Sequence, residues 1–251
     1  MSDRILRFDD WTDPVPPVAR EVLSVLPEIG DAAKPPVLFV PGPGHGAWVF
    51  AEHWLGHAAS RGFPAHALSL REDGGLRAYV HDVVQVAAGL PRQTVLVGHG
   101  AGAVVVEHVL ARYPARAAVL VSPGLDRWTA LRTNPIGTLP ALVGRKLRLR
   151  RSQLFSSVLP VAEADRYASR IGPAKLVPRG VPGRPVGHPP TLIAGSPDDR
   201  VVPRAVLDRT ASRHGAAPLL FPGMGHQLML ERDWVEPIDA ILDWLVKELV
   251  A

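Results

Sequence analysis

Three glycines are spaced two apart where an apolar stretch meets a helical pattern, in Val95–Gly102 (VLVGHGAG). Glycines on both sides of a central residue allow a sharp turn, which places that residue above a sheet and beside a helix N-terminus. A serine at the centre could attack a carbonyl carbon as a nucleophile. The central residue here is Gly100, so acyl-enzyme chemistry cannot proceed through this position.

The same glycines fit the dinucleotide-binding fingerprint, with Gly98, Gly100 and Ala103 in its three fixed places. Such a site also uses an acidic residue about 20 positions later, at the end of the next strand. That strand is expected to end at residues 121–123 (VSP), which include no carboxylate. We therefore expect no nucleotide cofactor. Ser122, at the same strand end, is interpreted as a structural residue that caps the turn.

Short apolar strands alternate with amphipathic helices along most of the chain, which predicts an α/β fold with a mostly parallel sheet covered on both faces. Ahead of this scheme, residues 4–11 and 20–28 flank a proline-rich turn and predict an N-terminal antiparallel hairpin. The expected strands are 36–40, 65–70, 94–97, 117–121, 191–194 and 218–221, and the expected helices are 48–60, 76–90, 101–112, 204–214 and 233–249.

The alternation breaks at residues 124–189, which are rich in proline, glycine and arginine and contain one helical pattern near 162–171. An insertion between two strands of a parallel sheet predicts a lid over the carboxyl ends of the strands, where such sheets bind ligands. We expect this lid to belong to a single domain of residues 1–251. The basic run Arg145–Arg151 lies within it. We interpret the run as a solvated face, with contact to an anionic ligand or a membrane as the alternative.

Composition excludes several classes of protein. The 28 basic residues barely outnumber the 24 acidic ones, so no nucleic-acid partner is expected. The absence of cysteine excludes disulfides, thiolate metal sites and a cysteine nucleophile. His81, Asp82 and His108 lie on expected helices without a second ligand at metal spacing, so no metal is expected. The N-terminal residues lack a signal-peptide pattern and no apolar run approaches the roughly 20 residues of a membrane span, which predicts a cytoplasmic protein.

Four segments together resemble the bacterial single-domain α/β-hydrolases of the lysophospholipase or esterase-like type, and the resemblance covers nearly all of the chain after Pro36. They are residues 41–48 (PGPGHGAW), 98–102 (GHGAG), 195–203 (GSPDDRVVP) and 221–230 (FPGMGHQLML). They resemble, in that order, the family's segment after the first parallel strand, its nucleophile turn, its acid turn and its histidine loop. The order nucleophile, acid, histidine is also that of the family.

The resemblance implies a role for individual residues. It makes His226 the catalytic base and Asp199 the acid that orients it. Asp198 is the alternative acid, because this turn is one residue longer than the commonest form. The backbone N–H of Ala101 becomes one donor of the oxyanion hole, and Gly100 occupies the nucleophile position.

Two departures from the family pattern point in one direction. Besides Gly100, Pro43 stands where the family supplies the second oxyanion donor, and proline has no N–H. Losing one such donor costs roughly 10²–10³ in rate, and losing the serine about 10⁴–10⁶. A deliberate Ser→Gly substitution would explain Gly100 but not Pro43, which favours a natural loss. The neighbouring Gly42, Gly44 and His45 are expected to line the pocket.

We therefore hypothesise an enzyme that acts on a small apolar carbonyl or ester-like metabolite through a His226–Asp199 acid/base dyad without an acyl-enzyme. Lyase or cyclase chemistry and direct attack by water both belong to this class. One alternative is a serine esterase or lipase-like hydrolase that carries an engineered substitution at Gly100. The other is a non-catalytic protein that binds a small molecule. The expected partner is a small-molecule substrate in each case, and the sequence does not indicate the oligomeric state.

Overall fold

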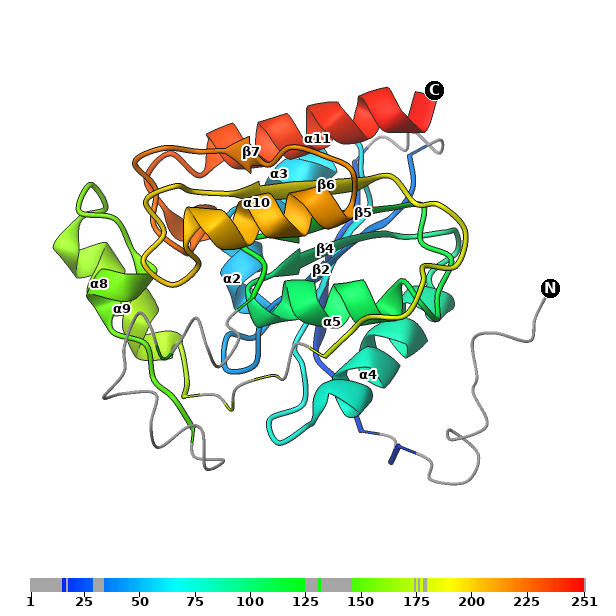
Figure 1. Ribbon diagram of the computed structural model, residues 1–251, viewed down its shortest axis with the longest axis horizontal. Coiled ribbons are helices and arrows are strands. Elements are labelled where there is room, and N and C mark those ends of the chain that lie inside the picture. The colour runs from blue at the N-terminus through cyan, green and yellow to red at the C-terminus, as the bar shows by residue number, and fades with distance from the viewer. Residues whose placement is uncertain are drawn as a thin grey trace.

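The computed structural model describes residues 15–16, 18–28, 34–124, 131, 146–173, 175, 177 and 180–250. Seven strands form one sheet in the order β1-β3-β2-β4-β5-β6-β7, and only the β1–β3 pair is antiparallel (Figure 1). The α/β fold with a mostly parallel sheet is therefore confirmed. The strands are β1 (Val22–Val25), β2 (Val37–Val40), β3 (Ala65–Leu68), β4 (Val95–His99), β5 (Ala117–Val121), β6 (Thr191–Gly195) and β7 (Leu219–Leu220).

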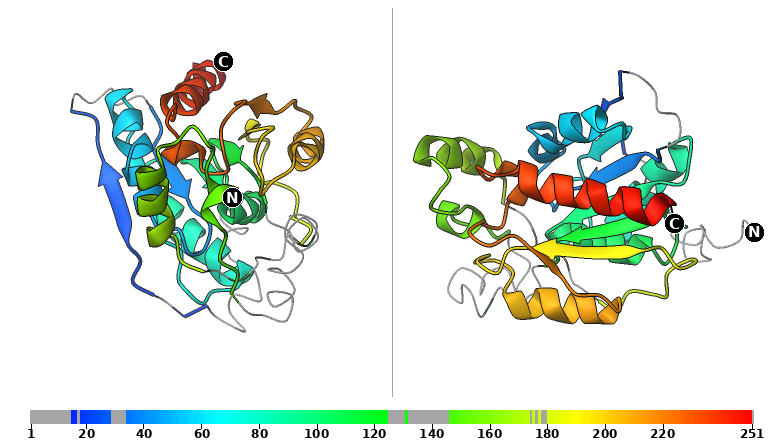
Figure 2. Two further views of the ribbon diagram at one scale, coloured as in Figure 1. Left: turned by 90° about the vertical axis from the view of Figure 1, so that its left-hand side faces the viewer. Right: turned by 90° about the horizontal axis from the view of Figure 1, so that it is seen from above.

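Helices cover both faces of the sheet (Figure 2). Every residue of strands β2, β3, β4 and β5 is buried, as expected for strands with helices on either side. One core cluster joins the sheet to α2 (Trp48–Ala51), α3 (Trp54–Ser60) and α11 (Val235–Val250). The second joins its other face to α4 (Leu76–Gly89), α5 (Ala101–Val109) and α10 (Arg204–Arg213). None of the described helices is both long and apolar enough to span a membrane.

Two expectations about the first third of the chain need correction. The single helix expected over 48–60 is wrong, because α2 and α3 are separated by a turn at Glu52 and His53, where the His53 ring stacks on Trp234 at 4.6 Å between ring centroids. The strand expected within 20–28 is present as β1, and its antiparallel partner is β3. The other strand of the expected hairpin, residues 4–11, lies outside the described part of the chain.

The insertion between β5 and β6 includes α8 (Arg151–Leu154) and α9 (Val161–Arg170). These helices lie beyond the end of the sheet toward which the strand arrows point (Figure 1). The α9 helix contacts α2, since Tyr167 stacks on Trp48 with 6.2 Å between ring centroids and Arg166 pairs with Glu52 at 2.9 Å. This part of the insertion therefore packs directly on the core.

The basic run alternates in direction. Lys146, Arg148 and Arg150 are exposed, whereas Leu147 is buried and Leu149 is half-buried. Residues of an extended segment point alternately to opposite sides, so one side of this run faces solvent while the other carries leucines. The expected solvated face is confirmed for the described residues; Arg145 lies outside them.

Candidate active site

The turn between β4 and α5 has a backbone conformation that side chains rarely adopt. Gly100 has φ 57° and ψ −123° and directly precedes the first residue of α5. Its N–H donates to the carbonyl of Val121 at 3.0 Å, and its own carbonyl accepts from the N–H of Gly124 at 3.0 Å. These two bonds hold residue 100 at the carboxyl edge of the sheet, in the place that the sequence predicts for it.

The three glycines of this turn serve different purposes. A Cβ atom on Gly98 would lie 2.6 Å from the Cα of Ala103, and one on Gly102 would overlap the carbonyl oxygen of Val40. Both glycines are therefore required by close backbone packing. Among the described residues other than its chain neighbours, a Cβ atom on Gly100 would meet only His226 within 4 Å, at 3.3 Å from Nε2. The space above Gly100 is thus open toward the imidazole of His226.

His226 and Asp199 form a buried pair. The Nδ1 atom of His226 lies 2.8 Å from Oδ2 of Asp199, and both residues are less than a tenth exposed. Oδ1 of Asp199 accepts from the N–H groups of Val201 at 2.7 Å and Val202 at 2.9 Å, which fixes the carboxylate. Because Nδ1 donates to the carboxylate, Nε2 carries the free lone pair, and it is this atom that faces Gly100.

Asp198 has a different position from Asp199. Its Oδ2 atom accepts from the N–H of Gly223 at 2.7 Å, so it joins the acid turn to the histidine loop. Of the two adjacent carboxylates, the structure therefore places only Asp199 in contact with the His226 ring.

A second buried carboxylate holds the histidine loop to the insertion. Glu231 accepts hydrogen bonds from the N–H of Gly225 at 2.9 Å, the N–H of Ser156 at 2.7 Å and the hydroxyl of Ser156 at 2.6 Å. Close by, the N–H of Gln227 donates to the carbonyl of Leu154 at 3.1 Å. The backbone before His226 is therefore fixed by Glu231, which also binds Ser156, and the backbone after it is fixed directly by Leu154 of the insertion.

Two further histidines lie beside His226. His99 is fully buried and donates from Nε2 to the carbonyl of His226 at 3.0 Å; its pKa is lowered well below the usual value by burial and by the nearby His226 and His45. Burial, followed by the proximity of His226, lowers the pKa of His45 to about 4. Both rings are thus neutral near neutral pH, and of the three only the His226 ring is bonded to a carboxylate in the described part of the chain.

Gly42 and Pro43 lie on the other side of the turn. A Cβ atom on Gly42 would be 3.6 Å from the backbone nitrogen of Ala101, so this loop passes over the N-terminus of α5. Pro43 lines the same space and offers a carbonyl but no N–H. Ala101, whose N–H the resemblance makes an oxyanion donor, lines the same pocket, and Pro43 contributes no backbone N–H to it.

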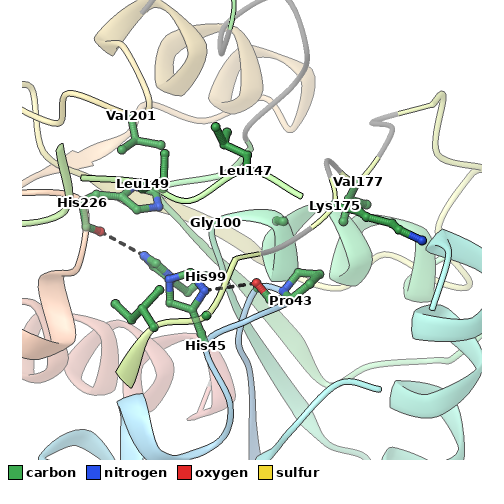
Figure 3. A pocket seen from close by; sticks show the side chains of 14 residues that line it. Pro43, His45, His99, Gly100, Leu147, Leu149, Lys175, Val177, Val201 and His226 are labelled. Atoms are coloured by element: carbon green, nitrogen blue, oxygen red, sulfur yellow. Dashed lines mark hydrogen bonds between the residues drawn. The ribbon is translucent and has the colours of Figure 1, made fainter. Parts of the chain in front are cut away.

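A pocket opens above this turn (Figure 3). Its aliphatic wall comes mainly from the insertion and from the segment after it. The ammonium group of Lys175 points away from His226 in Figure 3 and lies 3.9 Å from Asp73. The lining consists of Gly42, Pro43, His45, His99, Gly100, Ala101, Leu147, Leu149, Ile171, Gly172, Lys175, Val177, Val201 and His226. Gly44, which is exposed, lies outside this lining, contrary to expectation.

Ser122 does not replace the absent nucleophile. Its φ of 43° is unusual for a residue other than glycine, and its buried hydroxyl has no hydrogen-bond partner among the described residues. The expected capping bond is therefore not observed, and no base contacts the hydroxyl to activate it. Within the described ranges, no three histidine, aspartate or glutamate side chains are grouped closely enough to hold a metal ion.

The fold and this arrangement of turns agree with a comparison against known families. The model of the "Alpha/beta hydrolase family" matches residues 37–243, and the chain belongs to that family. No curated protein sequence matches the chain.

Solved structures with the same fold include several lipases and esterases. A monoacylglycerol lipase of Paleococcus ferrophilus is 18% identical, with a TM-score of 0.67 over 92% of this chain and 98% of that one. A soluble variant of the monoglyceride lipase of Saccharomyces cerevisiae is 15% identical, with a TM-score of 0.71 over 91% and 92%. A thermophilic esterase of Thermogutta terrifontis is 17% identical, with a TM-score of 0.64 over 91% and 93%. At these identities the likeness shows the fold alone.

Proposed function

We propose that this chain is an enzyme in which His226, oriented by Asp199, acts as general base and acid on a small apolar carbonyl or ester-like compound without forming an acyl-enzyme. One observation carries the proposal: a Cβ atom on Gly100 would lie 3.3 Å from Nε2 of His226, while Nδ1 is bound to Asp199 at 2.8 Å. The base is thus aimed at the space that a serine hydroxyl would fill.

A water molecule in that space gives a complete hydrolytic reaction. His226 Nε2 takes a proton from the water, whose oxygen forms a bond to the carbonyl carbon while the carbonyl π electrons move onto its oxygen. The tetrahedral intermediate then reforms the carbonyl and breaks the bond to the leaving oxygen, which receives the proton from His226. Asp199 stabilises the charged imidazolium between these two transfers. Lyase or cyclase chemistry would use the same proton transfer on a substrate proton in place of water.

The pocket lining supports an uncharged, apolar substrate. Leu147, Leu149, Ile171, Val177 and Val201 present aliphatic carbon to the space near Gly100. The Lys175 ammonium, the only permanent charge among the lining residues, is directed toward Asp73 instead of toward the base. We further propose that residues 124–189 act as a lid that sets specificity, because several of these lining side chains come from that segment.

A serine esterase with a substituted nucleophile is the second candidate, and one observation favours it. A Cβ atom on residue 100 would meet His226 at 3.3 Å and no backbone atom among the contacts of the described residues, and the conformation of the turn is the strained one in which such folds hold their serine. The two candidates differ in the activity expected of the protein with Gly100 in place. Only the general-base enzyme would turn over a substrate in that form.

The test is steady-state hydrolysis of p-nitrophenyl esters of increasing chain length by the unmodified protein. We expect turnover that His226→Ala lowers by roughly 10²–10⁴, the usual contribution of a positioned general base. Ser122→Ala is the matched control and should leave the rate nearly unchanged. Turnover that survives His226→Ala would overturn the dyad, and the complete absence of turnover together with tight binding of an apolar ligand would make the chain a binding protein.

A further inference from the structure

Two nitrogen atoms converge beside Gly42. The position that a Cβ atom on Gly42 would occupy lies 3.6 Å from the backbone nitrogen of Ala101 and 3.6 Å from Nδ1 of His45. Both residues line the pocket above Gly100 (Figure 3). A carbonyl oxygen bound between them would therefore have one neighbour on the α5 N-terminus and another on the His45 ring.

The hydrogen bonds of His45 place its hydrogen on the ring nitrogen nearer to Gly42. The side-chain amide nitrogen of Gln227 lies 2.8 Å from Nε2 of His45, and an amide nitrogen can only donate. Nε2 is then the acceptor, so a neutral ring carries its hydrogen on Nδ1. Gln227 is itself fully buried and its backbone N–H is fixed by Leu154, while its Oε1 has no partner among the described residues. The contact of Nδ1 with the carbonyl of Pro43 favours the same tautomer, because a carbonyl oxygen only accepts.

The Nδ1–H group of His45 makes a long hydrogen bond in the structure. It contacts the carbonyl of Pro43 at 3.4 Å, longer than the 2.7–3.2 Å of ordinary N–H···O bonds, and the ring also interacts with the backbone of Gly42. Burial keeps the ring neutral, since it lowers the pKa of His45 to about 4. A neutral imidazole can stabilise a developing oxyanion as a hydrogen-bond donor without competing with the base for protons. His99 cannot take this part, because its Nε2 already donates to the carbonyl of His226 at 3.0 Å.

We propose that Nδ1–H of His45 is the second donor of the oxyanion hole, beside the N–H of Ala101, and replaces the backbone N–H that Pro43 lacks. Gln227 is the positioning residue that holds His45 in the donating tautomer. The inference rests on the proposed function for its carbonyl substrate, but its test does not depend on the native reaction.

The test restores a nucleophile and measures the oxyanion hole through it. In a Gly100→Ser protein, the second-order rate of labelling by a fluorophosphonate should fall by roughly 10²–10³ when His45→Ala is added, the size of one oxyanion donor. Pro43→Ala in the same Gly100→Ser background should change the rate by less than about tenfold, because the second donor is already present. His66→Ala, which removes a histidine of β3 bonded to Ser24, is the matched control.

Three results would overturn the proposal: a rate unaffected by His45→Ala, a gain of about 10² from Pro43→Ala, or a complete lack of labelling in the Gly100→Ser protein. The tautomer is read independently in the unmodified protein from long-range ¹H–¹⁵N correlations at neutral pH. We expect hydrogen on Nδ1 of His45 and a mixed tautomer in Gln227→Leu. Hydrogen on Nε2 would contradict the proposal even if a variant failed to fold. Failure of the proposed function alone would appear as His226-independent turnover with the labelling results intact.

Discussion

The two halves of the site differ in how much of a hydrolytic apparatus they retain. On one side, His226 and Asp199 are buried, bonded to each other at 2.8 Å and supported by backbone N–H groups. On the other, Gly100 has no hydroxyl and Pro43 has no N–H. The pair to which we assign proton transfer is complete, whereas both departures fall on groups that would form and stabilise a covalent intermediate.

This difference separates two tasks that a serine hydrolase performs with one set of residues. Orientation of the imidazole depends on Asp199 and on the loop bonded to Glu231, and neither requires residue 100 to have a side chain. Covalent catalysis depends on residue 100 directly. A chain can therefore lose the second task and keep the first, provided that another group, such as water, occupies the vacant space.

The largest effect is expected on the turnover rate, when Asp199, the acid of the proposed dyad, is replaced. Asp199→Asn should lower His226-dependent turnover by roughly 10²–10⁴, because the amide no longer selects the tautomer or stabilises the imidazolium. Asp198→Asn is the matched control on the adjacent carboxylate, which contacts Gly223 instead of the histidine ring. Steady-state rates for both variants decide the assignment; a larger loss in Asp198→Asn would reverse it.

A smaller effect is expected on the pH dependence of stability, through the neutral His45 beside Pro43. The pKa of His45 is about 4 in the folded chain, below the usual 6.5, so the unfolded state binds this proton more readily. The resulting contribution to stability is present above pH 6.5 and is lost as the pH falls toward 4, by about 3 kcal/mol. Urea denaturation between pH 7 and pH 4 measures it. In His45→Gln the decline should be shallower, and an equal decline in both proteins would contradict the shift.

The smallest effect is expected on the free energy of unfolding, when the hydrogen bonds that support the histidine loop are weakened. Glu231→Gln places an NH₂ group among three donors, from Gly225 and Ser156, and leaves at least one of them unsatisfied. We expect a loss of about 1–3 kcal/mol in the free energy of unfolding. Urea denaturation gives the value, with Glu236→Gln on α11 as the control. A loss of stability no larger than that of the control would show that the loop does not depend on this carboxylate.

The sequence was sufficient for the fold and for the groups nearest the chemistry. Apolar runs of four to five residues predicted β2, β4, β5 and β6 within one or two positions, since buried parallel strands have a simple composition. The contact between His226 and Asp199 followed from two turns that resemble family motifs. Glu231 and Gln227 were missed, because their roles depend on contacts with residues 154–156 and His45, far away along the chain.

The residues of the pocket wall are only partly predictable from the sequence, because they too depend on contacts between distant residues. The charge of the run Arg145–Arg151 predicts only a solvated face, whereas the alternation within it turns Leu147 and Leu149 toward the pocket. The helix expected over 48–60 failed because its break at His53 is stabilised by Trp234, a contact between residues distant in sequence. Local patterns fix strands and turns, whereas positions that depend on tertiary contacts need the structure.

The most direct test of the central claim is intact-protein mass spectrometry of the unmodified chain, quenched within milliseconds while it turns over an activated ester. We expect product formation without an initial burst and a protein mass that stays unchanged throughout, because His226 activates water at the space above Gly100. A burst accompanied by an added acyl mass on Ser122 or any other residue would contradict it, since the reaction would then proceed through a covalent intermediate.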